Sequence, residues 1–174
     1  MKDGLIIFFR YKFNPISIVI RFFINLGYKK KCPYNHVGII IKDENGEFHV
    51  VESNEKGVHS TPFKERVEGK NFMLRYIKFN EEGLKGYTEE HTGKKYDYWG
   101  TILHQGLFFI TGSWFGHSQA FAGKVFYCSE LVGKLINSCD ESMYKEWHKL
   151  NPRDLYISSK IYRMNSSQNQ KAYE

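Results

Sequence analysis

Residues 35–52 have the sequence NHVGIIIKDENGEFHVVE, which predicts a β-hairpin. The apolar run from Val37 to Ile41 predicts the first strand, Asp43 to Gly46 the turn, and Glu47 to Glu52 the return strand. His36 stands at the opening of the first strand. An imidazole at that place can serve as a general base for a neighbouring nucleophile, although a lone histidine on a strand more often has a purely structural role.

The length of the turn decides which side chains share a face with His36. A two-residue turn would put Glu52 on the opposite face of the sheet. A three-residue loop, with Gly46 in the left-handed region, would put Glu52 diagonal to His36 on one face and within reach of its ring. Hydrophobicity does not distinguish the two registers, because Val50 and Val51 would simply exchange faces.

Residues 126–132, with the sequence FYCSELV, predict the start of a helix. Apolar residues recur with helical spacing at Leu131, Val132, Leu135 and Ile136. Cys128 therefore falls at or just before the first turn, where unpaired N–H groups and the helix dipole favour a thiolate. His36 is the candidate base for this thiol. The alternative is that Cys128 is a small buried apolar residue, the commonest setting of a free cysteine.

The rest of the chain predicts short strands and helices on both sides of the hairpin. We expect strands at residues 5–9, 57–61 and 72–79, and helices at 14–26, 81–91 and 98–107, the last capped by Asp97. Residues 106–126 show no clear period, and no regular structure is expected there. Strands clustered in the middle of the chain with helices on both flanks indicate the α+β class.

The length and composition predict one domain. The chain has 174 residues, 41% of them hydrophobic, which is enough for one substantial core but not for two. We expect a single domain over residues 1–165. Residues 166–174 are mostly polar, so we expect a flexible tail there.

Charge and cysteine usage indicate the compartment and exclude some partners. A formal charge of +6 could favour an anionic membrane, but the basic residues are scattered, and the lysine run at residues 29–31 is typical of a solvated loop rather than a nucleic-acid site. Three cysteines at separations that match no zinc pattern or disulfide framework favour a reducing compartment. Polar residues interrupt the apolar N-terminal region, so we expect neither a signal peptide nor a membrane-spanning helix, and we predict a cytoplasmic protein. No metal or cofactor is expected.

Five short motifs follow one another along the chain. They are Asn35-His36-Val37-Gly38-Ile39, Val51-Glu52, Gly57-Val58, Tyr96-Asp97 and Tyr127-Cys128-Ser129-Glu130-Leu131-Val132. In this order, with the histidine before the cysteine, they resemble the circularly permuted NlpC-like papain-fold cysteine hydrolases, in particular the YiiX-like amidase family. The resemblance extends from about Asp3 to a closing segment at residues 151–155.

This resemblance implies a permuted papain-like fold, in which a small antiparallel sheet or barrel packs against helices and the nucleophile lies at a helix N-terminus. It further implies that Cys128 is the nucleophile, His36 the base and Glu52 the orienting acid. The implied reaction is cleavage of an amide, in a peptide or an amidated small molecule, through an acyl-enzyme. Such a role for Glu52 favours the three-residue loop in the hairpin.

Several alternatives stay open at this stage. Relatives of lecithin:retinol acyltransferase use a second histidine as the third group, so His49 or His59 could take the place of Glu52. The same site could serve a thiol-dependent lipid esterase or acyltransferase, with a lipid or membrane surface as partner. A non-catalytic basic binding module is the competing class. Tyr96 and Asp97 are expected to position the chain, with substrate contact as the less favoured role, and residues 106–126 could form a substrate-facing wall or an aromatic loop packed on the core.

Overall fold

The computed structural model describes residues 5–11, 15–26, 29, 31–77, 81–96, 107, 110–111, 125–139, 146–158 and 161–163. The strands are β1 (Leu5–Phe9), β2 (His36–Lys42), β3 (Phe48–Asn54), β4 (Gly57–Pro62), β5 (Phe72–Tyr76), β6 (Lys95–Tyr96), β7 (Val125–Phe126) and β8 (Tyr162–Arg163). The helices are α1 (Pro15–Phe23), α2 (Phe63–Val67), α3 (Glu81–His91), α5 (Cys128–Cys139), the 3-10 helix η2 (Trp147–Lys149) and α6 (Pro152–Ile157).

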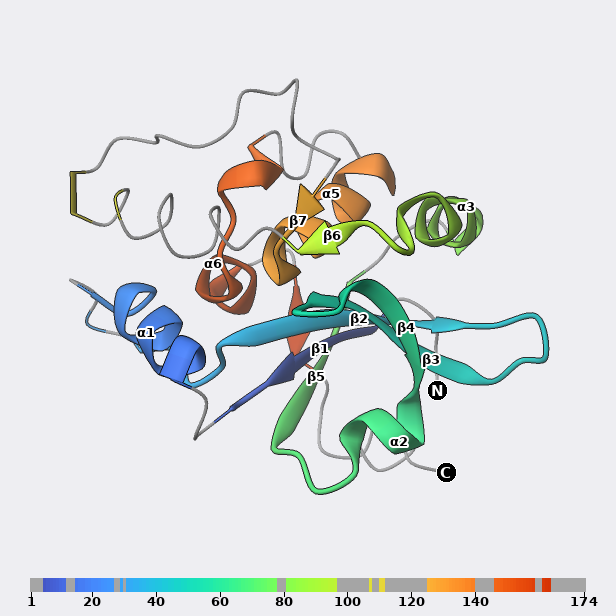
Figure 1. The fold of residues 1–174 in the computed structure, drawn as a ribbon, viewed down its shortest axis with the longest axis horizontal. Helices are drawn as coiled ribbons and strands as arrows, with labels where there is room; N and C mark the ends of the chain where they lie inside the picture. The colour runs from blue at the N-terminus through green and yellow to red at the C-terminus, as the bar shows by residue number, and fades with distance from the viewer. Residues whose placement is uncertain are drawn as a thin grey trace.

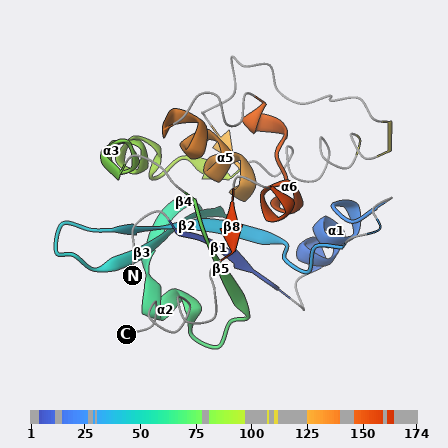
Figure 2. The ribbon, with the colours of Figure 1, turned by 180° about the vertical axis from the view of Figure 1, so that it is seen from behind.

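An antiparallel sheet with the strand order β4-β3-β2-β1-β5-β8 forms the centre of the molecule. Helices α3, α5 and α6 lie on one side of this sheet and α2 on the other, while α1 lies at one end, as both views of the ribbon show (Figures 1 and 2). Strands β6 and β7 form a separate parallel pair. The α+β class predicted from the sequence is confirmed.

Helices cover both faces of the sheet, which explains the uninterrupted apolar run in β1. Its odd-numbered residues pack with Phe63 of α2, and its even-numbered residues pack with Val132 and Ile136 of α5. All five residues of β1 are buried. Since a strand covered on both faces has no polar side, every position in it is apolar.

Most predicted elements in the described part of the chain are confirmed. Strand β1 and helix α3 have the predicted bounds, β2 and β4 extend the predicted strands by one residue at one or both ends, and β3 begins one residue later and ends two residues later than predicted. Helix α1 ends at Phe23 and continues as a turn to Leu26. Strand β5 ends at Tyr76, earlier than predicted, and the predicted residues 78–79 lie outside the described residues. Residue 14 of the first predicted helix, the predicted cap at Asp97, residues 98–106 and the tail at 166–174 lie outside the described residues.

The expectation that residues 106–126 lack regular structure was wrong where it can be compared. Val125 and Phe126 form β7, and Leu107, Ile110 and Thr111 are helical. Strand β7 pairs with β6, which lies about thirty positions earlier, so the structure of β7 depends on a distant partner and not on a local period.

None of the helices in the described part of the chain is both long and apolar enough to cross a lipid bilayer.

Candidate active site

The β2–β3 hairpin brings His36 and Glu52 into direct contact. Nε2 of His36 donates a hydrogen bond to Oε2 of Glu52 at 2.8 Å, and both side chains are buried. Ile39 lies opposite Val51 in the ladder. This register puts Gly38 opposite Glu52, so that Glu52 is diagonal to His36 on the same face of the sheet.

A three-residue loop produces this register. The backbone N–H of Asp43 donates to the carbonyl of Glu47 at 2.8 Å, which closes the loop. Gly46 has a φ of 81°, the left-handed conformation that glycine adopts without steric cost. Of the two registers compatible with the sequence, the structure therefore has the one that brings the carboxylate to the imidazole.

Gly38 allows β2 and β3 to approach closely beside this pair. A Cβ atom at this position would lie 2.9 Å from the carbonyl oxygen of Val51 and 3.3 Å from Cβ of Glu52. Any side chain here would therefore push the two strands apart and displace the carboxylate. Close packing against Val51 and Glu52 thus explains why a glycine stands two residues after His36.

Cys128 is the first residue of α5, as the helical pattern predicts. The N–H of Leu131 donates to the carbonyl of Tyr127, and Oε2 of Glu130 accepts from the N–H of Tyr127, so the first turn is capped from within. The Tyr127 hydroxyl donates to the carbonyl of His148 and the Ser129 hydroxyl to that of Leu150. These anchors explain why polar residues flank the cysteine, because they hold the helix start in one orientation.

The thiol of Cys128 lies close enough to the His36 side chain to raise the pKa of the imidazole, and both side chains line the same cleft. Since Nε2 of the imidazole faces Glu52, the other ring nitrogen is available to the sulfur. The Ser53 hydroxyl donates to the carbonyl of Phe126 at 2.6 Å. This bond joins β3 to the segment just before Cys128. The three residues implied by the family resemblance therefore lie together at one cleft, with the sulfur near the imidazole and the imidazole hydrogen-bonded to the carboxylate.

Arg66 is a further member of the site that the sequence did not predict. Its Nε donates to Oε1 of Glu52 at 2.6 Å and its Nη2 to Oε2 at 2.8 Å, a bidentate pair. The guanidinium lies 4.0 Å from the ring centre of Phe9 and contacts the hydroxyl of Tyr11. Arg66 comes from α2, a five-residue helix that was not predicted, and the surrounding Lys64, Glu65 and Glu68 give it the charge pattern of an ordinary surface helix.

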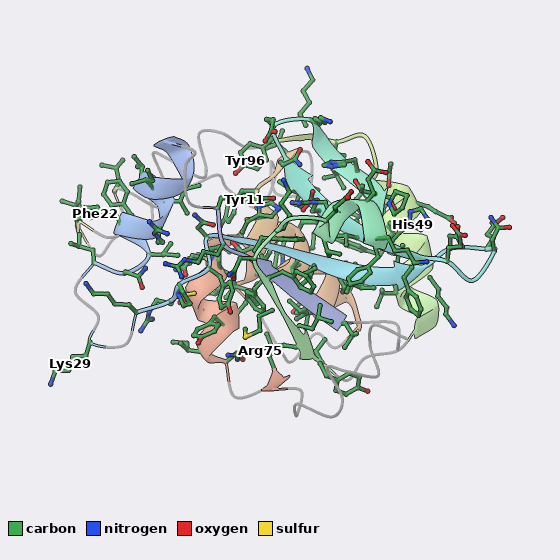
Figure 3. All side chains as sticks on the ribbon, turned by 90° about the horizontal axis from the view of Figure 1, so that it is seen from below. Tyr11, Phe22, Lys29, His49, Arg75 and Tyr96 are labelled. Atoms are coloured by element: carbon green, nitrogen blue, oxygen red, sulfur yellow. The ribbon has the colours of Figure 1, made fainter. Side chains whose placement is uncertain are left out.

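The two histidines considered as alternatives to Glu52 lie in different places. His59 stands opposite Glu52 in the β3–β4 ladder, with 3.5 Å between Nε2 and Oε1. It therefore contacts the carboxylate and not the imidazole of His36. His49 pairs with Asp43 near the hairpin loop and, in Figure 3, lies well away from Tyr11, which borders the site. The geometry assigns the position next to His36 to Glu52.

Charge and burial act in opposite directions on the pKa values of this pair. Burial alone would lower the pKa of His36, but the negative charges and hydrogen bonds of Cys128 and Glu52 hold it well above 6.5. Burial would also raise the pKa of Glu52, but hydrogen bonds from His36, His59 and Arg66 hold it well below 4.5. The pair is therefore an imidazolium and a carboxylate at neutral pH.

A cleft of about 670 Å³ opens over these residues and is within the size range of ligand sites. Cys128, His36 and Glu52 line it, together with Tyr11 and Tyr96, which Figure 3 shows on the same side of the molecule. Tyr96, for which substrate contact was the less favoured role, thus borders the space that a substrate would fill.

Asp43, Glu47 and His49 form the metal-compatible cluster among the described residues, with ligand atoms within 4.8 Å of one another. The Asp43 carboxylate already accepts hydrogen bonds from the N–H groups of Asn45 and Glu47, as expected of a loop residue, so we assign no metal to it.

Neither the known protein families nor curated protein sequences include a match to this chain.

The two pKa shifts predict how the stability of the protein depends on pH. The stabilisation from Glu52 is complete above its unfolded pKa of 4.5 and is lost as the pH falls below that value, at up to about 1.4 kcal/mol per pH unit for one proton. The stabilisation from His36 is complete below 6.5 and is lost as the pH rises through its higher folded value. Urea unfolding at pH 3, 5.5 and 9 should give the highest free energy of unfolding at pH 5.5. The same acid slope in a Glu52→Gln variant would contradict the assignment to Glu52.

Proposed function

We propose that the chain is a cysteine hydrolase that cleaves an amide through Cys128, His36 and Glu52, on a permuted papain-like fold. The observation that carries the proposal is that the thiol of Cys128 and the buried, hydrogen-bonded pair of His36 and Glu52 line one cleft that is large enough for a substrate. Burial of an ion pair is costly unless its geometry is good, and this arrangement serves nucleophilic catalysis better than simple packing. The resemblance to YiiX-like amidases supports the same reaction.

In this mechanism the Cys128 thiolate attacks the acyl carbonyl of the substrate, and the imidazolium of His36 gives its proton to the leaving amine. The product is a thioester on Cys128 and a free amine. His36, now neutral, takes a proton from water, and the resulting hydroxide attacks the thioester. The carboxylic acid is released, and the thiolate and imidazolium are restored. Glu52 keeps the imidazole in position and stabilises its charge throughout.

The start of α5 supplies the second requirement of acyl transfer, a place for the developing oxyanion. Cys128 is the first helical residue, and backbone N–H groups in the first turn of a helix have no partner within the helix. We assign the N–H of Cys128 as the hydrogen-bond donor to the oxyanion, assisted by the positive end of the helix dipole.

Free thiols at Cys32 and Cys128 agree with a reducing compartment such as the cytoplasm.

A thiol-dependent lipid esterase or acyltransferase is the second candidate, because it would use the same atoms. Ile20 of α1 lines the cleft, and the outer face of this helix exposes apolar side chains. An acyl chain could pass along that helix toward Cys128, whereas the charged residues around the cleft, among them Glu55, Lys56 and Lys70, suit a polar amide substrate.

Incubation with acyl p-nitrophenyl esters and acyl coumarin amides of several chain lengths tests the function directly. The wild-type chain should release the leaving group at least about a hundredfold faster than Cys128→Ala. Mass spectrometry should find the acyl group on the peptide that contains Cys128. Preference between esters and amides distinguishes the two candidates, and acylation of an added amine would indicate a transferase.

Cys32→Ala is the matched control for this experiment. Cys32 is also buried and free, and burial raises the pKa of its thiol to about 11, so its removal should leave turnover unchanged. Equal release by wild type and Cys128→Ala, without an acyl adduct, would contradict the hydrolase and favour the non-catalytic basic binding module.

A further inference from the structure

Helix α1 and the turn after it expose an apolar face. Of the seven large apolar side chains that are exposed in the described residues, four lie here: Ile18, Val19, Phe22 and Leu26, with Phe22 61% exposed. Their spacing puts them on one side of a helix. Figure 3 shows Phe22 at the extreme end of the molecule, away from the sheet.

The other side of this segment holds it in place. Ile24 is fully buried, and Ile20 lines the cleft beside Cys128. The side-chain amide of Asn25 donates to the carbonyls of Arg21 and Cys32 and accepts from the N–H of Cys32 at 2.6 Å. The apolar face is therefore presented by an anchored helix whose inner side reaches the candidate active site.

The part of the sequence that carries this face is rich in basic residues and has no acidic ones. Between Asp3 and Asp43 the chain has no Asp or Glu, but it has seven basic residues: Arg10, Lys12, Arg21, Lys29, Lys30, Lys31 and Lys42. In the structure Arg10, Lys29 and Lys31 are exposed. Lys29 projects from the same end of the molecule as Phe22 (Figure 3).

We propose that this surface, α1 with the turn to Leu26 and the basic residues Lys29 and Lys31, docks the protein on an anionic lipid membrane. The exposed apolar side chains enter the boundary between headgroups and acyl chains, and the lysines contact the anionic headgroups. Because Ile20 of the same helix lines the cleft, docking brings the cleft mouth close to the bilayer. A substrate carried by a membrane lipid could then reach Cys128 without leaving the membrane.

Charge decides between a membrane and a second copy of this chain as the occupant. Two copies that met through this surface would bring their basic residues together, and like charges across an interface oppose association. An anionic membrane instead offers an apolar interior beneath a negative surface, which matches both parts of the surface. The docking itself does not depend on the proposed hydrolase activity, because it is measured without a substrate.

Sedimentation with vesicles of phosphatidylcholine, with and without phosphatidylserine, tests the proposal. The wild-type chain should bind the anionic vesicles more tightly than the neutral ones, and added salt should weaken that binding. Phe22→Asp should weaken binding at least about tenfold, and Lys29→Ala about fivefold. Phe22→Leu, which keeps an apolar side chain, should retain most of the binding.

Lys64→Ala is the control for charge, because this lysine is exposed on α2, on the other side of the sheet from α5, and should not affect binding. Since Phe22 is exposed, its replacement should leave the thermal unfolding temperature nearly unchanged. Unaltered vesicle binding by Phe22→Asp would overturn the proposal. So would a dimer in solution that Phe22→Asp dissociates, if the wild-type chain shows no vesicle binding.

Discussion

Replacing Glu52 by Gln is expected to lower the free energy of unfolding by about 3–5 kcal/mol, the cost of breaking a buried ion pair by removing one partner. The amide has the same shape as the carboxylate but has one acceptor oxygen and two N–H donors. The groups that converge on Glu52, from His36, Arg66 and Asn54, are donors, so the new N–H groups would face other donors. Such a loss is a large part of the 5–15 kcal/mol that typically stabilises a domain. Urea unfolding at pH 5.5 measures it.

A double-mutant cycle with Arg66→Met separates the ion pair from general damage to the fold. Glu52→Gln leaves the half-buried guanidinium without its counterion, and Arg66→Met leaves the carboxylate without its bidentate partner. With both replaced, neither charge is stranded, so the double variant should be more stable than the sum of the single losses by about 1–3 kcal/mol. Additive losses would contradict the proposed coupling. Glu55→Gln, at an exposed cleft carboxylate, is the control and should change stability by less than about 0.5 kcal/mol.

The same buried carboxylate marks the limit of what could be predicted from the sequence. The strands β1 to β4 and the helix α5 follow from local pattern, because each has apolar residues that burial on the sheet requires. Helix α3 was predicted from a polar stretch that is compatible with a helix. Local pattern also predicted that His36 lies at the start of a strand and Cys128 at the start of a helix. It could not choose between the two hairpin registers, since Val50 and Val51 suit either face, and the role of Glu52 came only from the family resemblance.

Arg66 shows why the rest could not be predicted. Its contact with Glu52 joins residues fourteen positions apart through a helix of five residues, which is too short for a periodic signal. Its charge is one among several in that helix, and only the three-dimensional placement of Glu52, Phe9 and Tyr11 distinguishes it. The apolar face of α1 was hidden for a similar reason. Start and stop signals in the sequence predicted a helix there, but which of its residues stay exposed depends on how Ile20 and Ile24 pack.

The reactivity of Cys128 should depend on His36 by about two orders of magnitude at pH 6, which is the lower end of the usual contribution of a general base. An imidazolium beside the sulfur favours the thiolate, and His36 keeps its proton to a pH well above 6.5. The wild-type chain should therefore react with iodoacetamide at Cys128 in mildly acidic solution. In His36→Ala the rate at pH 6 should fall about a hundredfold, and its pH profile should move to that of an ordinary thiol, with a midpoint near about 8.5.

Peptide mass spectrometry measures each cysteine separately, so Cys32 serves as an internal reference within the same sample. Burial raises the pKa of Cys32 to about 11, and its thiol donates to the carbonyl of Tyr34, so it should stay unlabelled at pH 6. His49→Ala, at the far end of the hairpin, should leave labelling of Cys128 unchanged. A slower reaction in His59→Ala than in Glu52→Gln would move the orienting role to His59. If His36→Ala labels Cys128 as fast as the wild-type chain does, sulfur and imidazole do not share a proton, and the hydrolase mechanism fails even though both side chains line the same cleft.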